Sequence, residues 1–465
     1  MAVVQSFGAA EVVTGSCHVL KIKKEPTIMV DCGMFQGLIE GRNYEPFGFD
    51  PSSIDILLIT HAHLDHIGRI PKLVKEGFKG KIYALESTME LAEVVLLDSA
   101  HLMEEEYKTR FKKAQRRGKE KKVKKPLYTV EDVNTLYDMD INYVTYNDSV
   151  KLSKNITATF RNAGHILDSA MIEIEYKEDE KKKKIVFSGD LGNHNDLVMR
   201  DPVTLQKCDT LYIESTYGDR NHKGIKDTED EFKSVIVNTL LNEGNVLIPS
   251  FAIERTQEIL CILKQMYDKK ELPECKVFID SPMAIRATKL YDKYHDELSK
   301  CCNDFLKRDG SVFEFPYVNF TLKPDESKKI NEEKSGCIII AGSGMCSGGR
   351  ILHHFKQRLW NERNSVLFVG YQAKGTLGRR IVDGDRFVKI YHEKILLKAK
   401  VYTINGFSAH ADQNDLIEWM KSFEKLGKIY LVHGERDKQE VFKKVIKKRM
   451  GKKAHIVKEV EKIWI

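Results

Sequence analysis

The sequence predicts an α/β fold, and two patterns along the chain carry this prediction. Over the middle of the chain, short continuous apolar runs alternate with helical stretches, which is typical of a doubly wound parallel sheet. Outside that region, several apolar runs each end in a histidine, an aspartate or a glutamate, and open sheets bind ligands in a crevice beyond the ends of their strands. With 465 residues, of which 42% are hydrophobic and 31% charged, the chain is long enough for two or three domains with cores of their own.

The most informative stretch is His-Ala-His-Leu-Asp-His at residues 61–66, directly after the apolar run 54–60. Histidine makes up only 15 of 465 residues, so a polar turn with three solvated histidines at these offsets is a poor explanation. Imidazole nitrogens and carboxylate oxygens suit zinc, and alternating positions of an extended loop can send side chains to two different ions. The stretch therefore predicts a metal site formed by His61, His63, Asp65 and His66.

Other apolar runs, scattered from the first tenth of the chain to its last, end in residues of the same kind. Taken singly, each would more often be a hydrogen-bonded structural residue, and Asp-Cys-Gly at 31–33 would ordinarily be only a turn. As a set, they predict convergence at one place outside the strand ends. The residues are Asp31, His165, Asp190, Glu214, His410 and His433.

These motifs resemble a known family. The pattern His-x-His-x-Asp-His is similar to the signature of the metallo-β-lactamase superfamily, and an α/β domain inserted into such a core resembles the β-CASP nucleases. The resemblance implies a metallo-β-lactamase αββα sandwich with an inserted β-CASP α/β domain, a parallel sheet flanked by helices. The expected domains are residues 1–215 for the first part of the metallo-β-lactamase domain, 216–394 for the β-CASP domain and 395–465 for the C-terminal part of the metallo-β-lactamase domain.

The resemblance also implies a ligand set and a catalytic set. Two Zn²⁺ ions per chain are expected, the first on His61, His63 and His165. The second ion is expected on Asp65, His66 and His433, with Asp190 bridging the pair. Asp31 is expected to accept a hydrogen bond from a ligand histidine. The expected catalytic residues are Asp65, Glu214 and His410, with His410 as the general acid and Glu214 holding its ring.

The function implied by the resemblance is that of a zinc-dependent ribonuclease, an endonuclease that hydrolyses RNA phosphodiesters by a two-metal hydroxide and leaves 5′-phosphate and 3′-hydroxyl ends. His433 favours RNA, since RNA-acting members of the family carry histidine at this motif. The alternatives are a DNA nuclease of the same family, a hydrolase of small esters, thioesters or lactams, and a non-catalytic RNA-binding scaffold. The expected partner is single-stranded RNA, with no membrane and no nucleotide cofactor; a homodimer is left open.

Two further stretches have a structural and a functional interpretation. The formal net charge is +7, and residues 107–125 are rich in lysine and arginine. Such a run is ordinarily a solvated helix face, and its alternative is a contact surface for a phosphate backbone. The glycine-rich stretch 342–350 is either a tight turn or a loop that offers backbone N–H groups, Ser343 and Arg350 to substrate phosphates.

The cysteines and the hydropathy of the chain indicate the cellular compartment of the protein. The nine cysteines include no Cys-x-x-Cys pair and are expected to be free thiols in a reducing compartment. No apolar run is long enough to cross a bilayer. Together these features predict a cytoplasmic protein.

Overall fold

The structure is a computed structural model, and it describes residues 2–178, 181–370, 372–373, 375–404 and 406–465. These residues form two compact units. The first, unit 1, contains the chain up to His194, residues Asp201–Asn221 and residues His410–Ile465, and the second, unit 2, contains residues Asn195–Arg200 and His222–Ala409. The domain boundaries expected at 215/216 and 394/395 stay a prediction.

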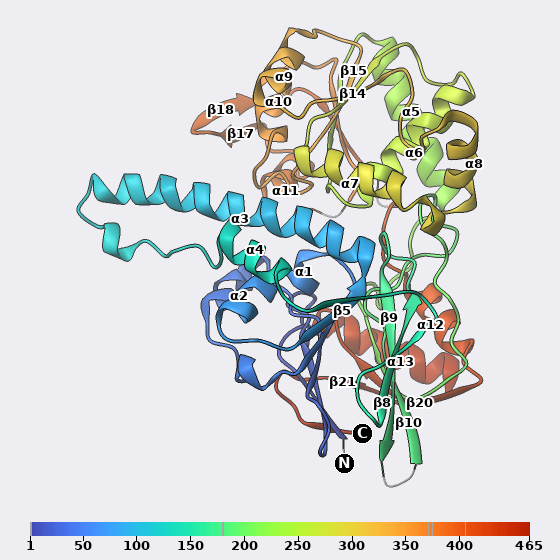
Figure 1. Cartoon of the computed structure of the whole chain (residues 1–465). Coiled ribbons are helices and arrows are strands. Elements are labelled where there is room, and N and C mark those ends of the chain that lie inside the picture. The colour runs from blue at the N-terminus through green and yellow to red at the C-terminus, as the bar shows by residue number, and fades with distance from the viewer. Residues whose placement is uncertain (1, 179–180, 371, 374, 405) are drawn as a thin grey trace. The chain divides into compact units, whose positions relative to one another are not determined.

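Two mixed sheets form the centre of unit 1 (Figure 1). Within the described residues, the first sheet contains, in spatial order, β22 (Ile463–Trp464), β1 (Ala2–Ser6), β2 (His18–Ile22), β3 (Ile28–Val30), β4 (Ile56–Leu58), β5 (Lys81–Leu85) and β6 (Ile141–Val144). The second contains β21 (Ala454–Ile456), β20 (Lys425–Leu431), β11 (Lys207–Ile213), β10 (Lys181–Phe187), β9 (Ala170–Glu178), β8 (Ile156–Asn162) and β7 (Ser149–Lys151). Strands β3 to β6 are parallel, as are β10, β11, β20 and β21, so several strands of each sheet end at one edge.

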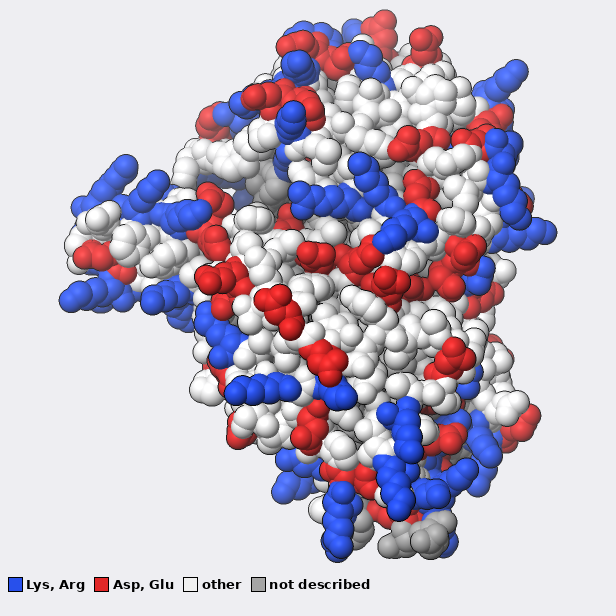
Figure 2. Space-filling model, in the orientation of Figure 1, with Lys and Arg blue, Asp and Glu red and all other residues white. Residues whose placement is uncertain are grey.

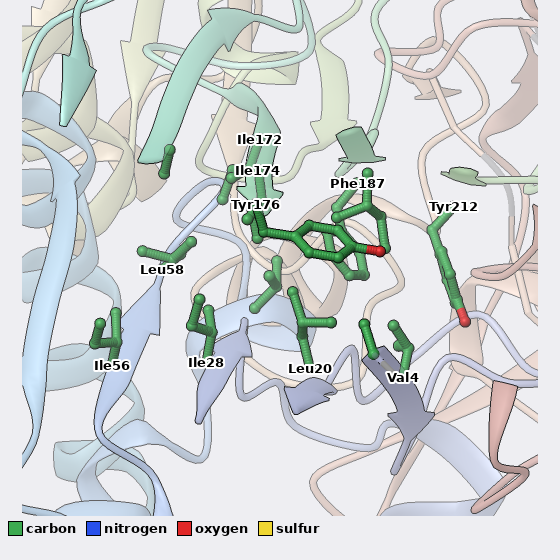
Figure 3. Close-up of a cluster of buried hydrophobic side chains, with 14 of the residues drawn as sticks. Val4, Leu20, Ile28, Ile56, Leu58, Ile172, Ile174, Tyr176, Phe187 and Tyr212 are labelled. Carbon is green, nitrogen blue, oxygen red and sulfur yellow. The ribbon is translucent and has the colours of Figure 1, made fainter. Parts of the chain in front are cut away.

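Apolar side chains from the facing sides of the two sheets form a core between them (Figure 3). Leu20 and Ile28 of the first sheet lie in this core together with Ile172 and Ile174 of β9. Met171, one position before Ile172, belongs to a second cluster on the other face of its sheet. This alternation is the period of two that side chains follow along a strand. The sheets therefore pack face to face.

Helices cover the outer faces of both sheets. On the first sheet, α3 (Glu86–Gln115) contacts β5. On the second sheet, Trp419 of α12 (Gln413–Lys421) and Phe442 of α13 (Arg436–Met450) pack in one cluster with Ile429 of β20. The remaining helical segments of unit 1 are η1 (Gly37–Tyr44), η2 (Pro51–Ser53), α1 (Leu64–Ile67), α2 (Ile70–Lys75), η3 (Glu120–Lys122) and α4 (Val130–Tyr137). The order helix, sheet, sheet, helix confirms the predicted αββα sandwich.

Helix α3 extends well beyond its last buried residue. Its buried residues end at Ala100, yet the helix continues to Gln115, and η3 folds back against it. Lysines and arginines gather on this projecting arm (Figure 2). Two of them are paired along the helix, Lys108 with Glu105 and Arg110 with Glu106, so part of the basic run is a solvated helix face. Among the described helices, none combines the length and apolarity needed to cross a bilayer.

Unit 2 contains a parallel sheet. In spatial order its strands are β14 (Val318–Phe320), β13 (Lys276–Ile279), β15 (Cys337–Ala341), β12 (Val246–Pro249), β16 (Ser365–Phe368) and β19 (Lys400–Thr403). All neighbouring pairs are parallel, which confirms the predicted α/β domain with a parallel sheet. Strand β19 lies in this sheet beside β16, although the sequence places residues 395–465 with the metallo-β-lactamase domain. A hairpin is formed by β17 (Phe387–Ile390) and β18 (Glu393–Leu396).

Helices separate the strands of unit 2, as the alternating pattern predicts. They are α5 (Ile225–Leu241), α6 (Arg255–Asp268), α7 (Pro282–Lys293), η4 (His295–Glu297), α8 (Lys300–Asp309), α9 (Pro324–Lys329), η5 (Ile330–Glu332), α10 (Ile351–Arg358) and α11 (Leu377–Val382). Ile351 and Phe355 of α10 pack against Ile339 of β15, which is fully buried. Apolar side chains thus fix the helices to the sheet.

A buried carboxylate ties four segments of unit 2 together. Asp280 follows β13 and is fully buried. Its Oδ1 accepts hydrogen bonds from Thr321 and Arg350, both at 2.7 Å. Its Oδ2 accepts from Ser327 at 2.6 Å and is 2.7 Å from Nε2 of His354. Burial alone would raise the pKa of Asp280, but these hydrogen bonds outweigh burial and hold it well below its usual range.

Replacing this carboxylate should destabilise the protein. Asp280→Asn removes the charge that Arg350 faces, and we expect the free energy of unfolding at pH 7 to fall by about 3–5 kcal/mol. Because the pKa is depressed in the folded state, the contribution of Asp280 is present above about pH 4 and is lost as the pH falls through the folded pKa. Urea unfolding followed by circular dichroism should therefore show that the free energies of unfolding of wild type and variant become equal at acidic pH. Asp325→Asn, at an exposed carboxylate, is the matched control, and equal stability of D280N and wild type at pH 7 would contradict this role.

Candidate metal centre

Seven of the residues named from the sequence meet beyond the strand ends of unit 1. Two groups contain all seven, and within each group all ligand atoms lie within 4.8 Å of one another; a third group of the same kind joins Glu214 to Asp190 and His433. The first group is His61, His63, His165 and Asp190. The second is Asp65, His66 and His433. Both groups draw on the loop after β4, and they take further residues from the β8–β9 loop and from the ends of β10 and β20.

The spacing within the first group fits a tetrahedral ion. Nδ1 of His63 lies 3.2 Å from Nε2 of His61 and 3.2 Å from Nε2 of His165. Oδ2 of Asp190 lies 3.4 Å from Nε2 of His61 and 3.6 Å from Nε2 of His165. A zinc ion with ligands at 2.0–2.1 Å in a tetrahedron requires about 3.3 Å between its ligand atoms. These four side chains therefore suit a metal-binding site.

The second group has similar spacing and reaches the same carboxylate. Nε2 of His66 lies 3.2 Å from Nε2 of His433 and 3.3 Å from Oδ2 of Asp190. Oδ2 of Asp65 lies 3.5 Å from Nε2 of His433. Oδ2 of Asp190 is thus within 3.6 Å of ligand atoms from both groups. The other oxygen of Asp190, Oδ1, is buried and has no hydrogen-bond partner among the described residues, as expected of an atom placed for a cation.

Asp31 and Thr60 orient two of these histidines. The carboxylate of Asp31 accepts a hydrogen bond from Nδ1 of His66 at 2.7 Å and from the hydroxyl of Thr60 at 2.8 Å. Because the Thr60 hydroxyl donates its single proton to Asp31, it accepts from Nδ1 of His61, 3.0 Å away. Both histidines then carry their proton on Nδ1 and turn the lone pair of Nε2 toward the shared space. Asp31 thus accepts a hydrogen bond from His66, and its role beside a metal ligand stays a prediction.

Thr216 does the same for His433. Its hydroxyl donates to the carbonyl oxygen of His433 at 3.2 Å and lies 3.0 Å from Nδ1 of the same residue. It therefore accepts from that Nδ1, which leaves the lone pair of Nε2 for a ligand. Sequence reasoning assigned no role to Thr60 or Thr216. Their only signal was adjacency, since Thr60 precedes His61 and Thr216 follows Glu214 by two positions.

The turns that bring these residues together have special backbone conformations. Asp31 has φ = 59° and His433 has φ = 49°, in the left-handed region that non-glycine residues rarely adopt. Gly33 lies so close to the backbone of Asp65 that a Cβ atom there would be 1.5 Å from the Asp65 carbonyl oxygen. The Asp-Cys-Gly sequence is therefore both a turn and a part of the site, because only glycine lets the two loops touch.

The protonation states suit cation binding. Burial, followed by the charge of His66, lowers the pKa of His61 to about 3, and burial lowers that of His63 to about 4. Burial alone would raise the pKa of Asp190, but the surrounding imidazoles hold it well below its usual range. Most ligand atoms are thus deprotonated near neutral pH, as metal binding requires. His66 differs, because Asp190 and Asp31 raise its pKa against the effect of burial, and a cation would replace the proton it carries.

His410 and Glu214 form a pair beside the two groups. Oε1 of Glu214 accepts a hydrogen bond from the backbone N–H of Leu191 at 2.7 Å and lies 3.2 Å from Nδ1 of His410. The ring of His410 lies 4.4 Å from that of His165 and 6.0 Å from that of His433. Burial alone would lower the pKa of His410, but Glu214, followed by Asp190, raises it to about 9. The Glu214 carboxylate thus favours the protonated form of this imidazole.

The two phosphate contacts expected in the glycine-rich stretch lie in unit 2 and have internal partners. Arg350 donates from Nη1 to Asp280 and to the carbonyl of Thr321, and from Nη2 to the carbonyl of Leu322. The hydroxyl of Ser343 accepts from the backbone N–H of Ser347 at 3.0 Å. Both side chains thus hold their own loop together, which argues against Arg350 as a free phosphate ligand. Their assignment to substrate stays a prediction.

Family models match three parts of the chain. Residues 10–135 match the metallo-beta-lactamase superfamily, residues 256–381 the Beta-Casp domain, and residues 394–457 the Zn-dependent metallo-hydrolase RNA specificity domain. A solved structure of a protein of unknown function from Enterococcus faecalis V583 is similar in fold, with a TM-score of 0.56, 13% identity and full coverage of both chains.

Relatives extend the likeness over nearly the whole chain. Ribonuclease TTHA0252 of Thermus thermophilus is 38% identical over 93% of this chain and 93% of its own. An RNase J-like protein of Methanocaldococcus jannaschii is 32% identical over 94% and 93%. Transcription termination factor FttA of Methanosarcina mazei is 31% identical over 93% of this chain and 67% of its own. Coverage this complete, on a sandwich whose strand ends carry the histidine and aspartate groups, places the chain in the β-CASP family of the metallo-β-lactamase superfamily.

Proposed function

We propose that this protein is a zinc-dependent ribonuclease that cuts RNA internally and leaves 5′-phosphate and 3′-hydroxyl ends. The observation that carries the proposal is the meeting of two ligand groups at Asp190, with the His410–Glu214 pair beside them. The names of the Thermus and Methanocaldococcus relatives and of the matched RNA specificity domain support RNA as the substrate. Single-stranded RNA and a cytoplasmic location belong to the same proposal.

The ligand groups divide between two zinc ions. His61, His63 and His165 would hold the first, and Asp65, His66 and His433 the second, with Asp190 between them. Bound there, the pair of ions would supply a hydroxide near neutral pH and stabilise negative charge on the phosphate. Thr60, Thr216 and Asp31 contribute by fixing the imidazole tautomers.

His410 has the properties of a general acid. Its Nδ1 is occupied by Glu214, so Nε2 is the atom that can give a proton to the leaving 3′-oxygen. Its raised pKa, to about 9, keeps that proton in place near pH 7. Glu214 therefore orients the ring and holds its charge.

The alternatives make different demands on the site. A DNA nuclease would use the same centre on another substrate, and a hydrolase of small esters, thioesters or lactams would need no nucleic-acid surface. A non-catalytic scaffold would have lost members of the ligand groups, and none of the seven expected ligands is missing here.

Metal-dependent cleavage of RNA tests the proposal directly. Labelled RNA and DNA of the same sequence are incubated with the protein, with and without a chelator, and the products are resolved on a gel. We expect internal cuts in RNA, loss of cutting with the chelator and recovery on adding Zn²⁺. Intact RNA under zinc-replete conditions would refute the proposal, and equal cutting of DNA would favour the DNA-nuclease alternative.

Replacing His410 distinguishes between two roles for this residue, a general acid and a zinc ligand. His410→Ala should lower kcat by about 100- to 10,000-fold, since a general acid contributes that much. Zinc content, measured by atomic emission, should stay at about two ions per chain because His410 belongs to neither group. A variant that loses zinc would show that His410 is a ligand instead.

The dependence of kcat on pH tests whether the charge of Glu214 raises the pKa of His410. Since Glu214 raises the pKa of His410, Glu214→Gln should move the alkaline limb of the kcat profile to lower pH. Glutamine keeps an oxygen for the N–H of Leu191, so the fold should survive. An alkaline limb unchanged in the variant would mean that another group titrates there.

Asp31 should matter for the metal and not for the chemistry itself. Asp31→Asn weakens the acceptor for Nδ1 of His66, and we expect zinc affinity to fall by about 10- to 100-fold. Titration with a chelating dye measures this loss, and excess zinc should restore most of the activity. Wild-type zinc affinity in the variant would contradict the orienting role.

A further inference from the structure

A basic groove lies in unit 1 at the edge strands of the two sheets. Its volume is about 920 Å³, and the edge strands β21 and β22 both contribute to its lining, together with β20 and α13. Six lysines and two glutamates line it, along with aromatic side chains. The lysines are Lys428, Lys443, Lys444, Lys447, Lys453 and Lys462. This groove is concave and strongly positive.

The positive charge of the groove is not neutralised from within. Among the described residues, no carboxylate forms an ion pair with any of the six lysines. The two glutamates are engaged elsewhere: Glu440 pairs with Arg436 at 3.2 Å, and Glu461 with His455 at 3.0 Å. Ammonium groups gathered without counter-charges attract a polyanion.

The groove lysines on α13 share one side of the helix. Lys443, Lys444 and Lys447 are spaced three and four positions apart, and all three are exposed. Phe442 and Ile446, on the opposite side, are fully buried in the cluster that packs α13 on the second sheet. Packing thus holds the exposed lysine side toward the groove.

An exposed indole completes the groove. Trp464 lies on β22, whose backbone pairs with Val3 of β1, yet the side chain is 53% exposed. Leaving so large an apolar ring in water beside lysines favours a partner with both flat rings and negative charge. Single-stranded nucleic acid has both, since bases stack on aromatic rings while lysines contact the phosphates.

The groove is separate from the metal centre. Strand β20 links them, because Lys428 lines the groove and His433 follows the end of the strand. At about 3.3 Å per residue, these positions are about 16 Å apart along the chain. A ligand in the groove would therefore not contact the metal ligands through Lys428.

We propose that this groove is a binding site for a single-stranded segment of RNA outside the position of cleavage, with its phosphates on the lysines and a base stacked on Trp464. The inference rests on the proposed ribonuclease function for the identity of the polyanion. The groove would raise affinity for long RNA without taking part in hydrolysis.

Direct binding of oligouridylate tests the groove without any cleavage. Wild type and variants, in the presence of a chelator, are titrated with labelled oligouridylate over a range of salt concentrations. Lys443→Gln/Lys447→Gln should reduce the slope of log affinity against log salt by about 0.7 for each lysine. Trp464→Ala should weaken binding by about 10-fold. Lys177→Gln/Lys182→Gln, a pair of exposed lysines on β9 and β10, is the matched control and should change neither quantity.

A second assay separates the groove from the ribonuclease proposal. With zinc, the Lys443/Lys447 variant should lose kcat/KM on long RNA but hydrolyse bis(p-nitrophenyl) phosphate as fast as wild type. Oligouridylate affinity unchanged in both groove variants would overturn the groove proposal, whatever the cleavage assay shows. Binding lost in the variants, together with a wild type that cuts no RNA, would refute the ribonuclease proposal alone. If the protein bound polyglutamate as tightly as oligouridylate, and Trp464→Ala did not weaken that binding, the ligand of the groove would be an acidic protein and not RNA.

Discussion

The burial of Asp190 among imidazoles is the interaction on which the rest of unit 1 depends. Its carboxylate is removed from water, and its Oδ2 lies within 3.6 Å of histidines from both ligand groups. A buried charge is costly unless opposite charge and hydrogen bonds offset the lost hydration. Here Oδ1 has no hydrogen-bond partner in the described structure and lies 3.5 Å from Nδ1 of His433, while the imidazoles around the carboxylate hold the pKa of Asp190 well below its usual range. A cation held between the two groups would add to this stabilisation and take up the free oxygen.

That requirement explains why the site takes residues from so many segments. A single loop offers at most a few ligand atoms, and the six residues from His61 to His66 cannot surround two ions. Parallel strands in two facing sheets end near one another, so short turns after β4, β10 and β20 reach a common space. The left-handed conformations of Asp31 and His433 are the local cost of these turns, and hydrogen bonds to Thr60 and Thr216 hold both residues in place.

The family resemblance implied the sandwich, whereas sequence patterns predicted the parallel sheet of unit 2 and the set of residues that meet, because both depend on local signals: apolar period, strand ends and ligand-type side chains. They did not predict the roles of Thr60 and Thr216. Each hydroxyl orients a histidine because its proton points to another acceptor, and these partners are distant in the chain. Arg350 was one of two candidate phosphate contacts in its glycine-rich stretch, and the buried charge of Asp280, 70 positions earlier, holds its guanidinium; its contact with phosphate stays a prediction. The pairing of β19 with β16 could not be predicted either, because nothing in the sequence of a short apolar strand indicates which sheet it joins.

The groove and the metal centre need opposite electrostatic surroundings, which favours placing them apart. A centre that holds dications is built from carboxylates and neutral imidazoles, and six unpaired ammonium groups in contact with it would weaken cation binding. At physiological ionic strength, exposed charges are largely screened beyond about 8 Å. Lys428 on β20 precedes His433 by five residues, about 16 Å of extended chain. An RNA strand is long enough to use both, because each added nucleotide brings its own phosphate, so charge that would harm the centre at short range can act on the substrate at longer range.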